Sequence, residues 1–124
     1  SDIICTTTPS TTPVLPDDKE LLRGKCIIAI GSYMPEMREI PDAVLDLVDN
    51  VYIELPYACE ESGDLSQPLA SGKLTKDRVK LMHEYLVSGE KEIKEGQTTY
   101  FKSVGMGLFD VCIAQKLYEV AKEK

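Results

Sequence analysis

The chain has 124 residues, 43% hydrophobic and 28% charged, and its 21 acidic against 14 basic side chains give a formal net charge of -7. This length supports one hydrophobic core and is too short for two independent ones. The composition is close to the average of globular proteins, and the negative charge argues against nucleic acid and anionic membranes as partners. No apolar run approaches the roughly 20 residues that a membrane helix needs.

Two runs near the amino end predict β-strands. Residues 2–8 are rich in β-branched side chains and are followed by Pro9. Residues 25–30 are mostly apolar at consecutive positions and end at Gly31, which is typical of a parallel strand covered on both faces. Between them, residues 16–22 have room for one or two turns of helix.

The central part of the chain predicts two helices around a strand and a loop. Apolar residues recur at helical spacing over 40–48, and 51–55 follows as a third strand. Residues 56–73 show no sustained period, so we expect a loop with about one helical turn at 60–65. Thr75 can cap a helix, and Leu74 and Val79 occupy the positions of a hydrophobic staple, so we expect a further helix over 75–87.

The carboxyl-terminal part predicts one strand and one long helix. Residues 98–104 are strand-like, and the charged run 90–95 before them is expected to be a solvated connection. One face of the last helix is marked by Met106, Phe109, Ile113, Leu117 and Val120. Strands joined by helical crossovers predict an α/β fold with a parallel sheet, flanking helices and a long C-terminal helix.

The sulfur and carboxylate side chains form no metal-binding pattern. The four cysteines lie far apart without a C-x-x-C pair, and the chain has one histidine, so structural zinc is disfavoured. Glu60, Glu61 and Asp64 could share a helical turn, but loop carboxylates are usually solvated, and no metal is predicted. Cys5 and Cys26 fall in predicted strands as reduced core residues, which predicts a cytoplasmic location.

Small and hydroxyl-bearing residues follow three of the predicted strands, at 6–9, 30–33 and 102–105. Ligands of parallel sheets bind at the carboxyl ends of strands, so these segments are candidate binding residues. Ordinary turn chemistry accounts for the same residues. Tyr33 is placed to donate a proton or stack on a ring, and a packing role is an equal alternative.

Four motifs occur in the order of a known family: DIICTTTP at 2–9, AIGSYMP at 29–35 with Arg38-Glu39, ESGDL at 61–65 and YFKSVG at 100–105. The chain resembles the ornithine cyclodeaminase and mu-crystallin family. The resemblance implies a Rossmann-like, doubly wound domain that binds NAD or NADP, with residues 1–124 forming its C-terminal half. The glycine fingerprint and the substrate domain are absent from these residues, so the choice between the two coenzymes is not encoded here.

The resemblance also assigns site residues and an activity. In cyclodeaminases an aspartate acid/base occupies the position of Tyr33, and a basic residue that of Met37. A phenol is a poor base at neutral pH, so we expect imine reduction or amino-acid dehydrogenation rather than ornithine cyclisation, with Tyr33 as catalytic residue. The implied contacts are Thr8, Ile30, Gly31, Ser32, Tyr33 and Ser103 with the cofactor, and Val104 with the substrate.

Two alternatives and two further expectations accompany this assignment. A nucleotide-binding or hormone-binding protein without turnover, as in the mu-crystallin branch, is the first alternative, and a plain α/β domain is the second. The chain alone is expected to be inactive and to bind coenzyme weakly. An uncovered apolar face predicts a homo-oligomer or association with the missing segment.

Overall fold

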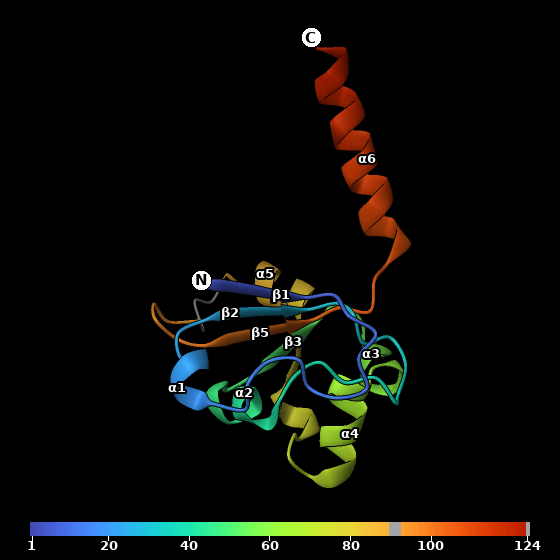
Figure 1. Ribbon diagram of the computed structural model, residues 1–124. Coiled ribbons are helices and arrows are strands. Elements are labelled where there is room, and N and C mark those ends of the chain that lie inside the picture. The colour runs from blue at the N-terminus through green and yellow to red at the C-terminus, as the bar shows by residue number, and fades with distance from the viewer. Residues whose placement is uncertain (90–92, 124) are drawn as a thin grey trace.

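The computed structural model describes residues 1–89 and 93–123, which form a five-stranded parallel sheet in the order β1-β2-β5-β3-β4 (Figure 1). The strands are β1 (Ile3–Thr6), β2 (Cys26–Ala29), β3 (Val51–Ile53), β4 (Val79–Leu81) and β5 (Thr99–Lys102). The helices are α1 (Lys19–Leu22), α2 (Asp42–Leu47), α3 (Ala58–Glu61), α4 (Gly63–Ser71), a 3-10 turn (Lys76–Arg78), α5 (Met82–Ser88) and α6 (Gly107–Lys122).

The strand register brings the carboxyl ends of the central strands to one level. Thr6 of β1 lies opposite Ala29 of β2, Ala29 lies opposite Lys102 of β5, and Lys102 lies opposite Ile53 of β3. Because all five strands run parallel, the segments that follow β1, β2 and β5 leave the sheet side by side at the same edge.

The hydrophobic core lies on one face of the sheet, where α1, α2 and α4 gather in Figure 1. Alternate residues of each strand point into this core, because successive side chains of a β-strand point to opposite faces of the sheet. Its fully buried side chains include Leu22, Ile27, Val44, Ile53, Leu65 and Tyr100. The opposite face carries α5, whose Tyr85 ring lies 5.1 Å from that of Tyr52 on β3. On that side Ile3 of β1 is 62% exposed.

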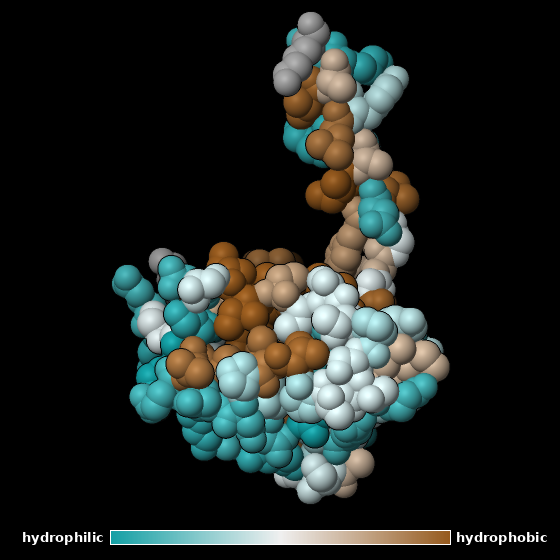
Figure 2. Space-filling view, viewed as in Figure 1, coloured by the Kyte–Doolittle hydropathy of each residue, from teal (hydrophilic) through white to brown (hydrophobic). Residues whose placement is uncertain are grey.

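The helix α6 extends away from the body of the molecule (Figure 1). Every residue described in it is exposed, although one face is apolar, as its sequence pattern predicts. Figure 2 shows hydrophobic residues along this helix and across the middle of the visible face of the sheet domain. Among the described helices, none is long and apolar enough to cross a membrane.

The prediction of one helix over 75–87 was wrong. Only Met82–Ser88 is α-helical, and Val79–Leu81 forms β4, the outermost strand beside β3. Val79 and Leu81 alternate with exposed Lys80, so the same apolar positions satisfy a strand as well as a helix. Pairing with β3, at Val51↔Val79 and Ile53↔Leu81, decides for the strand.

The loop expected over 56–73 is largely helical. The helices α3 and α4 occupy most of it, and the Ser62 hydroxyl caps α4 by accepting a hydrogen bond from the Asp64 N–H. Pro68 lies inside α4 and is buried beside Leu65, so packing against the core outweighs the hydrogen bond that proline removes.

The cysteine prediction was correct in part. All four cysteines are free, but Cys5 is exposed and Cys26 only half-buried. Both lie on the side of the sheet opposite the core, since Thr6 and Ile27, their neighbours in the strands, point inward. The expected connection over 90–95 includes residues 90–92, which lie outside the described residues.

Candidate functional site

The three segments singled out after β1, β2 and β5 lie together at one edge of the sheet. We call residues 6–8, 30–33 and 103–105 the strand-end edge. The N–H of Ile30 donates to the Thr6 carbonyl at 2.9 Å, and the N–H of Ser103 donates to the Ala29 carbonyl at 3.0 Å. Parallel pairing therefore continues one residue beyond the strands and keeps the segments adjacent.

A buried carboxylate, Glu39, joins the ends of β1 and β2. Its Oε1 accepts a 2.5 Å hydrogen bond from the Thr8 N–H, and its Oε2 accepts from the Thr6 hydroxyl at 2.8 Å and the Gly31 N–H at 2.9 Å. Burial by itself raises the pKa of Glu39, but the hydrogen bonds from Thr8, Thr6 and Gly31 outweigh it and lower the pKa below its usual value.

Gly31 is in close contact with Thr8. A Cβ built on Gly31 would lie 2.2 Å from both the N and the O of Thr8, and 2.7 Å from Glu39 Oε1. No side chain fits in this position without moving the backbone, because real Cβ contacts are much longer. The glycine therefore allows the ends of β1 and β2 to approach closely.

A second buried carboxylate, Glu54, holds the segment after β5. Its Oε1 accepts hydrogen bonds from the Ser103 hydroxyl at 2.8 Å, the Val104 N–H at 2.7 Å and the Gly105 N–H at 3.1 Å. Gly105 has φ +87°, in the left-handed region that favours glycine. This turn leads from the strand-end edge into α6.

A buried ion pair between Asp64 and Lys102 lies next to the strand-end edge. Asp64 Oδ1 accepts the N–H groups of Glu39 at 2.7 Å and Ile40 at 2.9 Å, and Asp64 Oδ2 lies 3.7 Å from Lys102 Nζ. Lys102 also donates to the Ala29 carbonyl at 3.3 Å. Burial is the largest influence on both groups, and it raises the pKa of Asp64 and lowers the pKa of Lys102.

The expected site residues differ in what they present to solvent. Ile30 and Tyr33 are 42% and 51% exposed, so their side chains are accessible to a ligand at the edge. Ser32 is fully buried, and its hydroxyl bonds the Met37 carbonyl and the Ser62 hydroxyl, each at 2.8 Å. The Ser103 hydroxyl is likewise used inside the protein, and Val104 is half-buried.

The sequence assigned no role to the residues that organise this edge. The sequence places Glu39 in a family motif, Asp64 among the loop carboxylates and Lys102 at the start of the candidate segment 102–105, whereas Glu54 lies in no candidate site segment. One signal was present in the sequence: Lys102 occupies an inward position of the alternating strand 98–104, where a charge requires a partner. Its partner, Asp64, is too distant in the chain for local pattern to reveal.

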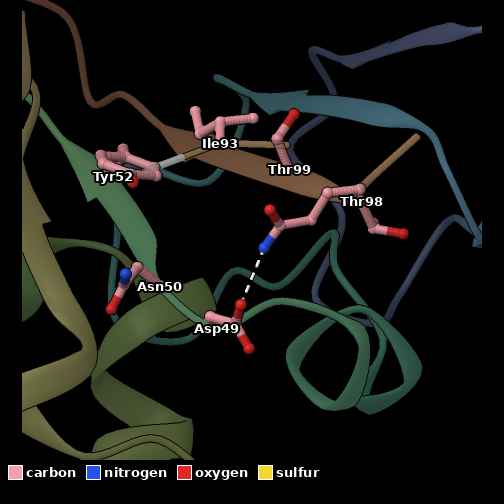
Figure 3. Close-up of a pocket in the computed structure, with 7 residues that line it drawn as sticks. Asp49, Asn50, Tyr52, Ile93, Thr98 and Thr99 are labelled. Carbon is pink, nitrogen blue, oxygen red and sulfur yellow. Dashed lines mark hydrogen bonds between the residues drawn. The ribbon is translucent and has the colours of Figure 1, made fainter. Parts of the chain in front are cut away.

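Among the described residues, one apolar cavity of about 300 Å³ borders the strand-end edge at Glu54 and Met106, and two others lie farther from it. A polar hollow of about 20 Å³, room for roughly one water, lies near the amino ends of β3 and β5 (Figure 3) and is bordered by a 2.8 Å hydrogen bond from Gln97 to Asp49. A groove of about 550 Å³ lies between β3, β4, α3 and α4, with Cys59 and Leu69 in its wall. Within the described residues, no group of three metal-ligating side chains occurs.

Comparison with known proteins identifies the family and the fold of the chain. The family model for the ornithine cyclodeaminase/mu-crystallin family matches residues 1–124. The chain belongs to this family. It is 37% identical over 127 aligned residues to a Delta(1)-pyrroline-2-carboxylate reductase of Bacillus cereus, covering 100% of the chain and 38% of the relative.

Two solved structures of this fold are similar throughout the chain. A probable ornithine cyclodeaminase from Bordetella pertussis superimposes with a TM-score of 0.79 at 31% identity, covering 100% of this chain and 40% of that one. A Delta(1)-pyrroline-2-carboxylate reductase from Thermococcus litoralis, in complex with NADH and L-proline, gives a TM-score of 0.79 at 24% identity. The chain thus spans about two fifths of the length of its relatives and has their Rossmann-type α/β fold.

Proposed function

We propose that the protein carrying this chain is an NAD(P)-dependent oxidoreductase that reduces small cyclic imines or dehydrogenates small amino acids. Residues 1–124 would form the later half of its nucleotide-binding domain. The observation that carries the proposal is the convergence of Thr8, Gly31 and Ser103 on one edge of a parallel sheet, in a family whose relatives include a pyrroline-carboxylate reductase. Ligands of such sheets bind at this edge.

The residues present fit the nicotinamide end of the coenzyme. Gly31 brings the ends of β1 and β2 into contact, and the exposed side chains of Ile30 and Tyr33 on either side of it are the groups that a flat ring would meet. The chain contains no G-x-G-x-x-G sequence, so the groups that hold the pyrophosphate would come from the remainder of the protein. When bound, the nicotinamide would supply or accept the hydride.

Tyr33 is our candidate proton donor. Its side chain is exposed at the strand-end edge, immediately after the buried Ser32 that anchors the turn. The Tyr33 hydroxyl carries a proton that it can donate to a substrate nitrogen, whereas a phenol does not replace a carboxylate as a base. This residue favours imine reduction over the cyclisation of ornithine.

The first test is turnover. The purified protein at its natural length would be followed by NAD(P)H absorbance with cyclic imines, with keto acids plus ammonia, and with ornithine. We expect oxidation of the reduced coenzyme with a cyclic imine or with a keto acid plus ammonia. Turnover of ornithine alone would refute the proposal.

The second test is Tyr33→Phe, with Tyr57→Phe as the matched control because Tyr57 is also exposed. Loss of a general acid lowers rates by about 10²-fold or more. We expect kcat to fall by that factor for Tyr33→Phe, with little change in coenzyme affinity, and the control to retain the rate of the unmodified protein. An unchanged kcat would remove Tyr33 from the mechanism.

The mu-crystallin branch suggests the alternative of binding without turnover. Tight coenzyme binding measured by calorimetry, with no hydride transfer to any of these substrates, would favour a nucleotide-binding or hormone-binding protein. The cytoplasmic location remains part of the proposal, in agreement with the four free cysteines.

The exposed apolar surfaces support a partner. Exposed hydrophobic residues mark one face of α6, including Phe109, Ile113 and Leu117 at 46–66% exposure, and Ile3 and Cys5 lie uncovered on the sheet. Contiguous apolar surface of this kind marks an interface. We propose that a second copy or the rest of the protein covers it.

Light scattering during size-exclusion chromatography tests the interface. We expect the 124-residue chain to self-associate, and the double substitution Ile113→Glu with Leu117→Glu to reduce its apparent mass. Elution of the unmodified chain as a compact monomer at about 100 μM, where an interface with a Kd of about 1 μM would be occupied, would contradict a second copy as the cover.

A further inference from the structure

We infer that Glu39 is a positioning residue for coenzyme binding: its buried carboxylate fastens the end of β1 to the end of β2 and so fixes Thr8 and Gly31 where the nicotinamide would lie. The role of Glu39 in coenzyme binding rests on the proposed function. Its role in joining the ends of β1 and β2 rests on the geometry alone.

Three donors from two strands meet on this one side chain. Thr8 gives its N–H to Oε1, while Gly31 gives its N–H and Thr6 its hydroxyl to Oε2. Thr8 and Glu39 are 31 positions apart in the chain and Gly31 and Glu39 are 8 apart, so no local turn brings them together. Oε1 thus holds the end of β1 alone, while Oε2 bonds both the end of β2, through Gly31, and β1, through Thr6.

Both oxygens have to be acceptors. If Glu39 were glutamine, one of its two terminal atoms would be an NH₂ group, which donates and cannot accept. The Thr6 hydroxyl could rotate to accept from that group, but the N–H of Thr8 or of Gly31 could not. An amide of the same shape therefore leaves one part-buried backbone N–H facing another donor, which costs part of its desolvation energy.

The location of Glu39 rules out a role as a surface charge. Its side chain is fully buried, and its N–H is held by Asp64, which is itself paired with Lys102. Glu39 is thus held in place by hydrogen bonds to both its backbone and its side chain. A group held this firmly positions what it binds, and preorganised contacts reduce the entropy lost when a ligand binds.

Glu54 provides an internal contrast. All three of its donors, from Ser103, Val104 and Gly105, use Oε1, and Oε2 has no hydrogen-bond partner among the described residues. Glutamine at this position can place its carbonyl oxygen where Oε1 lies and retain every bond. The two buried glutamates therefore predict opposite responses to the same isosteric substitution.

The first experiment measures amide hydrogen exchange by NMR and needs no coenzyme. In Glu39→Gln we expect the Thr8 or the Gly31 N–H, whichever faces the NH₂, to exchange at least 10-fold faster. In Glu54→Gln we expect the Val104 and Gly105 N–H groups to stay within about 2-fold of the unmodified protein. Equal responses in the two variants would overturn the inference.

The second experiment measures coenzyme affinity by NADH fluorescence in the protein at its natural length. We expect Glu39→Gln to raise Kd for NADH by about 10-fold, with a smaller change in kcat at saturating NADH. Glu20→Gln, on the exposed surface of α1, should leave both unchanged. An unchanged Kd in Glu39→Gln would overturn the role in binding.

Thr6→Val covers the case in which Glu39→Gln does not fold. It removes one of the three donors and keeps the side-chain shape, and Thr7→Val, at an exposed neighbouring position, is its matched control. We expect Thr6→Val to raise Kd for NADH about 2–5-fold and Thr7→Val to have no effect; equal effects would refute the inference. If the unmodified protein bound no NAD(P)H, the proposed function would fail, while the exchange experiment would still decide whether Glu39 fastens the strand ends.

Discussion

Substitution of Gly31 by alanine tests the close packing of the strand-end edge. The added methyl carbon would lie 2.2 Å from the backbone N and O of Thr8 and 2.7 Å from Glu39 Oε1. The obstructing atoms are mostly backbone, which cannot rotate away, so the ends of β1 and β2 have to separate. The strain is purely steric, since Gly31 has no positive φ.

The expected cost follows from two contributions. Overpacking of a buried site typically costs about 1–3 kcal/mol. Separation of the strands also weakens the hydrogen bonds of Thr8 and Gly31 to the Glu39 carboxylate, and bonds to charged groups contribute about 1.5–3 kcal/mol each. The lower conformational freedom of alanine in the unfolded chain offsets only about 0.4–1 kcal/mol. We expect Gly31→Ala to lower the free energy of unfolding by at least about 3 kcal/mol.

Urea unfolding followed by circular dichroism measures this cost. Slopes of about 1–3 kcal/mol per molar urea convert the expected loss into a midpoint lower by roughly 1–3 M. Gly107→Ala is the matched control, because a Cβ there meets no atom within 4 Å and the position begins α6; we expect it to be neutral or slightly stabilising. A Gly31→Ala midpoint within about 0.3 M of the control, less than 1 kcal/mol at such slopes, would show that the contact is not tight.

Three further outcomes follow from the buried charges and the thiols. Lys102→Met should destabilise the protein by about 3–5 kcal/mol in urea, because it leaves its buried partner Asp64 uncompensated; a loss below about 1 kcal/mol would count against the pair. The pKa of Glu39 is lower in the folded protein than in the unfolded chain, where it is near 4.5. The ionised Glu39 carboxylate therefore stabilises the folded protein fully above pH 4.5, and this stabilisation is lost as the pH falls through the folded pKa. The difference in unfolding free energy between the unmodified protein and Glu39→Gln should accordingly shrink below about pH 4. Burial raises the pKa of the Cys59 thiol, so a disulfide reagent should modify it at least about 10-fold more slowly than exposed Cys5, and equal rates would contradict this.

Much of the fold could be predicted from local pattern. The apolar run 25–30 became β2, the helical spacing over 40–48 contains α2, and the pattern after Met106 became α6. These features depend on the period with which side chains are buried, which is 2 for a strand and 3.6 for a helix. Where a short segment satisfies both periods, as at Val79–Leu81, only pairing with β3 decided its structure.

The candidate site was predictable as three strand ends but not as an assembled edge. Thr8, Gly31 and Ser103 were identifiable because small and hydroxyl residues after parallel strands indicate a ligand site. The sheet order, which inserts β5 between β2 and β3, decided which strand ends are neighbours.

The sequence by itself determined which segments bury apolar faces and which strand ends carry glycine and hydroxyl side chains. Only the tertiary structure determined that Glu39 and Glu54 lie buried against donors 33 and 49 positions away in Thr6 and Ser103. The physical reason is that a charged side chain is stable in the interior only when distant parts of the chain supply its hydrogen bonds. Local periodicity carries no record of such partners, and the folded sheet creates them.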